Sequence, residues 1–415
     1  MTKHANESLL TLLQVMLGLY FIALPFSPVL SPWIRDLPLW GTALSVLALL
    51  ASDRSALQDR SGLNLLGPAL CFLGTFALSF VFSENAAASL SRAKHLPTGV
   101  LVFIAAQLAA TDRRGFDRVS AALVGLTGIL LFEGAVQAIS GRGWIAESAS
   151  WANTERITSG LPHPNDLAIL AILAGFLPIH LSRLSAPWRW FAGAFLLAGY
   201  VVTTAFSRSR NLVIGLIVSL SVGTLTRRPA IRDRRLAGAA ALGIVISGAA
   251  WIADIGGIQA RSLSLSALAS DGRIGVWLVS WHLFESAPLT GVGPFLFGDY
   301  YLPLIAQVEL PAGYRPETSV VQWVHNLYLE ALAERGVIGL AGFAVLVFAS
   351  LTRVARSLGE APSGGRAQLQ AGALASAWTA FLVMGLFDLT FLKDWPWLFL
   401  WLLVGLSARI DRLDA

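Results

Sequence analysis

Long apolar runs alternate with short polar segments along most of the chain. A helix that crosses a bilayer core of about 30 Å needs roughly 20 mostly apolar residues, because every backbone amide and carbonyl must be satisfied within the segment. The pattern predicts about twelve such helices, at residues 8–25, 37–51, 63–82, 97–111, 118–139, 165–181, 188–205, 210–225, 236–253, 327–351, 369–387 and 393–408. The expected fold class is therefore all-α, a polytopic membrane protein.

Two longer polar segments, 140–164 and 254–326, interrupt this pattern. In the second, the run DGRIGVWLVSWHLFESAP predicts an amphipathic helix with Asp271 as its N-cap. Its apolar stripe is expected to consist of Ile274, Trp277, Leu278, Trp281 and Phe284. The expected organisation is transmembrane helices 1–9 over residues 1–253, an outward-facing loop with amphipathic helices over 254–326, and transmembrane helices 10–12 over 327–415.

Composition supports the same class. Hydrophobic residues make up 55% of the 415 residues and charged residues only 13%, whereas ordinary soluble domains carry about 25% charged residues. This excludes a cytosolic enzyme, a disordered protein and a nucleic-acid binder that works through a basic surface. Cys71 is the only cysteine, so a secreted module built on internal disulfides is excluded as well.

Basic residues set the expected orientation in the membrane. With the N-terminus in the cytoplasm, the inside segments hold Arg113, Arg183, Arg366 and the arginine cluster within 227–235, as the positive-inside bias requires. Both termini are then cytoplasmic, and both long polar segments face outward. The cytoplasmic connectors contain neither a GxxxxGK[ST] loop nor a GxGxxG turn, so we expect the functional site at the outer face.

Three arginines near the outer face are candidate binding residues. Arg208 and Arg210 lie in SRSRN, between two predicted spans with almost no loop. A charged residue at membrane depth costs about 2.5–3.5 kcal/mol on insertion scales, so it is a functional hypothesis; the alternative is an arginine that snorkels to the headgroups. Arg273 falls in the first turn of the amphipathic helix, where the helix dipole disfavours a cation and an anionic partner is therefore indicated.

His325 is the candidate catalytic residue, in VHNLYLEALAERGVIGL at the outer start of a predicted span. Histidine is suited to take or give a proton near neutral pH; the alternative is an interfacial histidine bonded to a headgroup. The six histidines show no metal-binding spacing, and we expect neither a metal nor a cofactor. A histidine with several arginines suits deprotonation of an acceptor while guanidinium groups neutralise a phosphate leaving group.

The order of four motifs, SRSRNLVIGL, GRIGVW, PLTGVGPFLFG and HNLYLEALAERGVIGL, resembles the O-antigen ligase and polymerase superfamily of bacterial membrane glycosyltransferases. The earlier RITSGLPHPNDLAIL also resembles this family through Gly160, Pro164 and Asn165. The resemblance extends from about residue 156 to residue 340. It implies a GT-C-like fold and a periplasmic site that transfers a glycan, with inversion, from undecaprenyl diphosphate to a hydroxyl acceptor, without metal or nucleotide.

The resemblance also implies roles for the candidate residues. His325 would be the general base, and Arg210 and Arg273 would bind the diphosphate. Arg208 is an alternative to Arg210, because the doubled SRSR leaves the register open. We favour Arg210, because SRNLVIGL fits the family pattern better.

A further basic pair lies on the same predicted face, in SENAAASLSRAKHL. From their side and charge, Arg92 and Lys94 are expected to add contacts to the diphosphate. His95 follows them directly and is a weaker second candidate for the general base.

The resemblance leaves the acceptor open. We expect an O-antigen ligase acting on the lipid A core oligosaccharide rather than a repeat-unit polymerase, because 140–164 is short for a polymerase's second outer loop. A protein O-oligosaccharyltransferase is less expected, because the chain ends a few residues after its last predicted span. The expected partners are the undecaprenyl diphosphate-linked glycan, the lipid A core and membrane lipids, with no nucleic acid.

A transporter or flippase of lipid-linked glycans is the alternative from another class. It would need ionisable groups at mid-depth in several spans, whereas Glu133 is the clearest such residue. The expected location is the bacterial inner membrane, which the chain crosses several times.

Overall fold

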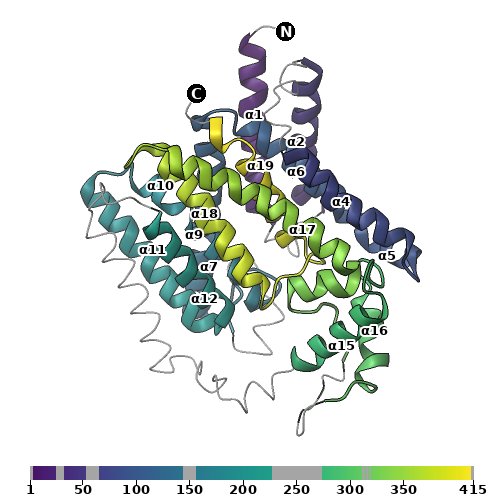
Figure 1. Ribbon diagram of the computed structural model, residues 1–415. Coiled ribbons are helices and arrows are strands. Elements are labelled where there is room, and N and C mark those ends of the chain that lie inside the picture. The colour runs from purple at the N-terminus through teal and green to yellow at the C-terminus, as the bar shows by residue number, and fades with distance from the viewer. Residues whose placement is uncertain are drawn as a thin grey trace.

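The computed structural model describes residues 3–24, 32–52, 65–143, 156–226, 273–310, 314, 316 and 319–412. All regular elements in these ranges are helices (Figure 1). They are α1 (Lys3–Ala23), α2 (Pro32–Ser52), α4 (Leu66–Val81), α5 (Ala86–Arg92), η3 (Ala93–His95), α6 (Leu96–Ala109), α7 (Arg113–Ser140), η4 (Pro164–Ala168), α9 (Ile169–Ala174), α10 (Leu177–Leu181), α11 (Ala186–Ser207), α12 (Arg210–Leu225), α15 (Arg273–Ser286), α16 (Phe297–Ile305), α17 (Leu327–Glu360), α18 (Arg366–Gly385), α19 (Asp394–Ser407) and η6 (Ile410–Arg412).

Every predicted span except 236–253 overlaps these helices, and each of them except 165–181 overlaps a single helix. The span predicted at 236–253 lies outside the described residues. The continuous helix predicted at 165–181 is wrong, because this stretch divides into η4, α9 and α10. Pro178 lacks the N–H that a continuing helix would need. Gly175 approaches α18 so closely that a Cβ atom there would lie 2.8 Å from the carbonyl oxygen of Ala373.

Four of the described helices are long and apolar enough to cross a membrane, over Asn6–Ala23, Arg113–Ser140, Ala186–Ser207 and Leu327–Glu360. The shorter apolar helices are Asp36–Ser52, Leu66–Val81, Pro164–Ala174, Arg210–Leu225 and Asp394–Ser407. The chain thus has the architecture of an α-helical membrane protein. The predicted number of twelve spans is not confirmed.

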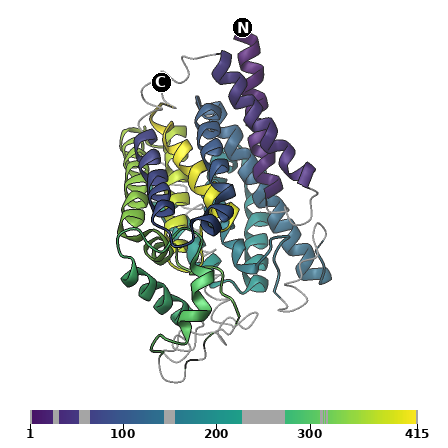
Figure 2. The same ribbon diagram turned by 90° about the vertical axis from the view of Figure 1, so that its right-hand side faces the viewer.

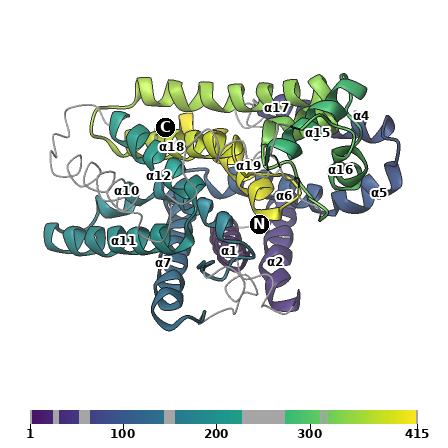
Figure 3. The same cartoon turned by 90° about the horizontal axis from the view of Figure 1, so that it is seen from below.

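The helices form one assembly with two distinct ends. Both termini lie at one end, and α15 and α16 lie at the other (Figures 1 and 2). Seen from below, α17 runs along one side of the assembly, next to α18 (Figure 3). The core includes α19, in which every residue from Trp395 to Ser407 is buried. This helix packs on α6, where Gly99 lies against the rings of Trp397 and Trp401.

The loop that follows α15 is joined to the backbone of α17. Gly336 has φ +65° and interrupts the helix. The N–H of Val337 therefore donates to the carbonyl of Pro288 at 2.9 Å, and the carbonyl of Glu334 accepts from the N–H of Gly293 at 3.0 Å. A Cβ at Gly336 would lie 2.3 Å from the loop backbone. Only glycine fits this crossing without displacing the loop.

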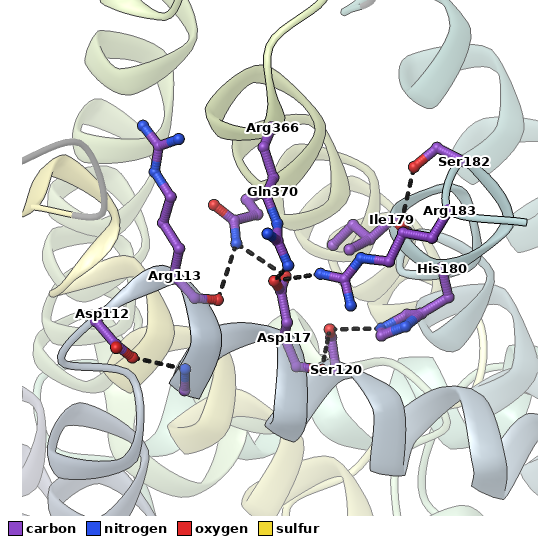
Figure 4. A network of polar contacts seen from close by, with 11 residues as sticks. Asp112, Arg113, Asp117, Ser120, Ile179, His180, Ser182, Arg183, Arg366 and Gln370 are labelled. Carbon is purple, nitrogen blue, oxygen red and sulfur yellow. Dashed lines mark hydrogen bonds and ion pairs between the residues drawn. The ribbon is translucent and has the colours of Figure 1, made fainter.

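A polar network around the buried Asp117 joins α7, α10 and α18 (Figure 4). Asp117, in α7, forms ion pairs with Arg183 and Arg366, and it accepts a 2.9 Å hydrogen bond from Nε2 of Gln370. Arg183 and Arg366 were both predicted to lie in cytoplasmic segments. Their contact with one carboxylate places these two segments on the same side of the assembly.

Candidate active site

His325 lies directly before α17 and is held there by an N-terminal cap. The side-chain oxygen of Asn326 accepts from the N–H groups of Tyr328 at 3.0 Å and Leu329 at 3.1 Å. Its Nδ2 donates to the carbonyl of Leu386 at 3.1 Å. Such a cap satisfies backbone donors that the first helical turn leaves open. It also fixes the start of α17 beside the end of α18.

The carboxylate of Asp388 lies against the ring of His325, with 2.5 Å between Oδ1 and Nδ1. Trp323 Nε1 also lies 3.2 Å from Nδ1. One ring nitrogen cannot donate to a carboxylate and accept from an indole at the same time. The carboxylate contact is shorter and charged, so we assign the proton to Nδ1. In a neutral imidazole Nε2 is then a proton acceptor.

The same carboxylate faces Arg273. The distance between Nη2 of Arg273 and Oδ2 of Asp388 is 3.8 Å, and the Asp388 side chain is only 4% exposed. Arg273 is the first residue of α15, as the sequence predicted. Asp388 therefore brings the predicted base and one predicted diphosphate-binding cation into one cluster.

The face that α15 buries differs from the predicted apolar stripe. The buried residues of this helix are Gly275, Val276, Val279, Ser280 and Leu283. These small and branched side chains allow α15 to pack closely on α16 and α17. The residues of the predicted stripe are half-buried, with Trp277 at the edge of the buried cluster, and Trp281 is 47% exposed. The predicted N-cap, Asp271, lies outside the described residues.

Lys393 adds a cation to the cluster. Its Nζ lies 4.6 Å from the centre of the Trp323 ring and 2.7 Å from Oδ1 of Asp166. The indole N–H of Trp395 donates to the same oxygen at 3.1 Å. Trp323 therefore lies between Lys393 and His325, whose ring it meets edge-on at 5.6 Å.

The surrounding charges keep Asp388 ionised. Burial raises the pKa of this carboxyl group, but the hydrogen bond and charge of His325, with Arg273 and Lys393, outweigh burial and hold the pKa below its ordinary value. An ionised Asp388 both orients the ring of His325 and favours the imidazolium that forms when His325 takes a proton.

His163 belongs to the same electrostatic cluster, and it was not predicted. Burial lowers its pKa and Lys393 lowers it further, while Asp166 and Asp388 oppose this change. Its Nδ1 accepts a 3.1 Å hydrogen bond from the N–H of Asn165. His163 thereby caps η4, which carries Asp166.

Arg156 connects the turn that carries Arg208 and Arg210 to η4. This buried arginine donates from Nε to the carbonyl of Ser207 at 2.7 Å and from Nη2 to Oδ1 of Asn165 at 2.9 Å. Arg208 ends α11 in the left-handed conformation, and Arg210 is the first residue of α12. The segment after Arg156 thus connects this turn with Lys393 through η4.

The second predicted basic pair has a different setting. Arg92 donates to the carbonyl of Phe295 at 2.8 Å and pairs with Asp299 at 2.9 Å, which fastens α5 to the start of α16. Lys94 is exposed. His95 Nε2 lies 2.8 Å from the carbonyl oxygen of Phe391. A carbonyl only accepts, so this nitrogen carries a proton and cannot act as the base in this state.

Backbone strain is concentrated around these segments. The described residues other than glycine with positive φ are Ser159, Arg208, Phe295 and His325. Conformations of this kind cost about 1–3 kcal/mol and persist only where the surrounding structure holds them, commonly at functional sites. Two of these four residues were predicted site residues, and the other two lie in loops that flank the cluster.

Sequence reasoning missed Asp388, Lys393, Asp166 and His163. A signal was present for Asp388 and Lys393, because Asp388 lies in the short connection between two predicted spans, as Arg208 does, and Lys393 is the first residue of the second span. In the described part of the chain, no group of three or more His, Cys, Asp or Glu side chains is placed to hold a metal ion.

Residues 193–344 match the family model described as O-antigen ligase. The match contains Arg208, Arg210, Arg273 and His325, whereas Asp388 and Lys393 lie beyond it. No curated protein matches the chain. Over this segment, which is about a third of the chain, the protein is similar to the O-antigen ligase family.

Proposed function

We propose that the chain is a metal-independent glycosyltransferase of the ligase type. It would move O-antigen polysaccharide from undecaprenyl diphosphate to a sugar hydroxyl of the lipid A core. The observation that supports this most is the position of Asp388, whose two oxygens face His325 at 2.5 Å and Arg273 at 3.8 Å. One ionised carboxylate thereby holds a proton acceptor next to a cation that can bind phosphate.

In the proposed reaction, Nε2 of His325 removes the proton from the acceptor hydroxyl. The oxygen attacks the anomeric carbon of the donor sugar from the face opposite the diphosphate, and the bond between that carbon and the diphosphate oxygen breaks. The electron pair of this bond leaves with the diphosphate, and the configuration at the carbon inverts. Asp388 stabilises the imidazolium, because its carboxylate stays ionised beside Nδ1.

Cations neutralise the charge that grows on the leaving diphosphate. A guanidinium has five N–H donors in a fixed fork, so pairing with one carboxylate oxygen is compatible with phosphate binding by Arg273. We assign Arg210, with Arg208 as the alternative, to the other side of the diphosphate. Arg92 and Lys94 would add weaker contacts, because Arg92 already has an internal partner.

The proposed site opens to the periplasm, with both termini in the cytoplasm of a bacterium whose inner membrane the chain crosses. Two observations support this. The termini lie at the end of the assembly opposite α15 and α16, and the segments predicted to be cytoplasmic meet at Asp117. The lipid carrier would then bring its diphosphate to the outer ends of α12 and α17.

A repeat-unit polymerase is the second candidate, because the family covers both activities and the cluster suits either acceptor. The deciding experiment uses the purified full chain in lipid nanodiscs with lipid-linked O-antigen. Rough lipopolysaccharide is added to one sample and no acceptor to the other. Transfer that requires lipopolysaccharide supports the ligase, whereas growth of the lipid-linked chain without it would show a polymerase. Glycan uptake into vesicles without transfer would instead indicate a transporter.

A further inference from the structure

Both backbone polar groups of Phe391 are held by side chains, the buried Glu330 and the half-buried His95. Its N–H donates to Oε1 of Glu330 at 3.0 Å, and its carbonyl oxygen lies 2.8 Å from Nε2 of His95. Phe391 itself is 1% exposed. It lies three residues after Asp388 and two residues before Lys393. Both charged groups of this loop are therefore carried by a backbone that is fixed between α17 and η3.

The two side chains that hold this loop are themselves fixed. Glu330 lies in the first turns of α17 and is 2% exposed. The ring of His95 packs edge-on against Phe295 at 5.1 Å and Trp397 at 6.1 Å. Burial lowers the pKa of His95 and outweighs the opposing charge of Asp394. The lowered pKa favours the neutral imidazole at neutral pH, and the nitrogen that faces the carbonyl carries the proton.

We propose that His95 and Glu330 are positioning residues for glycan transfer, and that they act by clamping the backbone of Phe391 so that Asp388 stays on His325. This inference rests on the proposed function. It gives His95 a role different from that of a second base: it is a permanent hydrogen-bond donor to the backbone. Neither residue needs to touch the donor or the acceptor.

The clamp matters because Asp388 has to be placed accurately. A carboxylate that orients a catalytic histidine works only at hydrogen-bond distance, and supporting interactions commonly set that distance. The loop leaves α18 and enters α19 within a few residues, and Asp388 is still bonded through its N–H to the carbonyl of Met384 in α18, whereas Phe391 lies beyond α18. The Glu330 and His95 bonds satisfy the N–H and the carbonyl of Phe391 instead of helical partners.

Two substitutions at position 95 distinguish a hydrogen-bond donor from a general base. His95→Gln keeps an N–H donor of similar reach but cannot accept a proton at neutral pH, whereas His95→Phe keeps the ring packing and removes the donor. Glu330→Gln keeps an oxygen acceptor, and Glu330→Leu removes it. The matched control is His180, whose Nε2 lies 2.9 Å from Oγ of Ser120 in α7; His180→Gln and His180→Phe serve there.

Two measurements are made on each full-length variant in nanodiscs: kcat and KM for transfer, and amide hydrogen exchange over residues 386–393. We expect His95→Phe and Glu330→Leu to lower kcat by about a hundredfold, the scale of a small misplacement of a catalytic group, with little change in KM. Exchange in the loop should become faster in both. His95→Gln and Glu330→Gln should restore most of kcat and the slow exchange, and the His180 variants should leave both readouts at the wild-type level.

Two results would each overturn the clamp. In the first, His95→Gln is as inactive as His95→Phe and loop exchange stays slow in both variants. In the second, His95→Phe leaves both kcat and loop exchange unchanged. The exchange measurement does not depend on the reaction. If the wild type transfers no glycan while loop exchange follows the donor and acceptor pattern, the proposed function fails and the clamp stands.

Discussion

The carboxylate of Asp388 lies 2.5 Å from the imidazole of His325, although the two residues are 63 positions apart in the chain. The contact joins the end of α18 to the start of α17. It also assigns the ring proton to Nδ1, which leaves Nε2 as the acceptor. Together with Arg273 on the other oxygen, this arrangement supports acid–base chemistry beside a phosphate-binding cation.

Asp388→Asn tests the orienting role. Asparagine keeps the shape of the side chain but cannot stabilise an imidazolium, so we expect kcat for transfer to fall by about 10²-fold or more. Steady-state transfer in nanodiscs measures this effect. Asp411→Asn is the control, because Asp411, in η6, pairs with Arg353 towards the C-terminal end of α17, away from the cluster. Equal rates for Asp388→Asn and the wild type would remove Asp388 from the mechanism.

Arg273→Lys and Arg210→Lys test whether these two arginines bind the diphosphate. Lysine keeps the positive charge but loses the planar fork that pairs with two phosphate oxygens. We expect each variant to reduce kcat/KM by about tenfold or more, a loss of about 1.4 kcal/mol of transition-state binding. Arg353→Lys provides the matched control at the Asp411 pair. Unchanged rates in both site variants would mean that neither arginine binds the leaving group.

The lowered pKa of Asp388 predicts how stability depends on pH. Its ordinary value is 3.8, and folding lowers it, so the ionised group stabilises the fold above that pH and loses this effect as pH falls through the folded value. Thermal unfolding of the wild type and Asp388→Asn should therefore differ most near neutral pH and converge in acid.

Asp411 is a control for this pH series, because its pKa is shifted in the opposite direction to that of Asp388. Burial raises its pKa, and the nearby Arg353 only partly opposes that change. The contribution of Asp411 to stability should therefore be present in acid and decline as pH rises through its folded pKa.

The outcome that would contradict the assigned ion pairs of Asp388 is a stability difference between the wild type and Asp388→Asn that stays constant across the whole pH range.

Gly336→Ala tests the junction between the loop after α15 and α17. The added Cβ would lie 2.3 Å from the carbonyl carbon and oxygen of Leu289, at a φ of +65°. We expect a loss of more than about 1 kcal/mol in the free energy of unfolding. Gly359→Ala lies in the same helix with nothing within 4 Å of the new Cβ, and it should leave stability unchanged or slightly higher. Equal stability of the two variants would mean that the loop does not occupy this crossing.

Much of the helical fold could be predicted from apolar periodicity. The predicted span 210–225 coincides with α12, and the start predicted at residue 327 coincides with the start of α17. The prediction failed at 165–181, because the break there depends on a close approach to α18 that a one-dimensional pattern does not contain. The loop joined to α17 at Gly336 is likewise a tertiary feature.

The site was predicted in part. The unfavourable position of Arg273 in a first helical turn, the proton chemistry of His325 and the ordered motifs identified these two residues, which the structure brings to one carboxylate. Asp388 and Lys393 were missed, because their roles depend on partners far away in the chain. The choice between Arg208 and Arg210 stays a prediction, and so does the role of Lys94.

The most direct test of the account is transfer by His325→Ala. The purified variant is compared with the wild type in nanodiscs containing lipid-linked O-antigen and rough lipopolysaccharide, and thermal unfolding confirms that it is folded. We predict that transfer falls by about 10²–10⁴-fold, the contribution typical of a general base. A folded His325→Ala protein that transfers glycan at the wild-type rate would contradict the account.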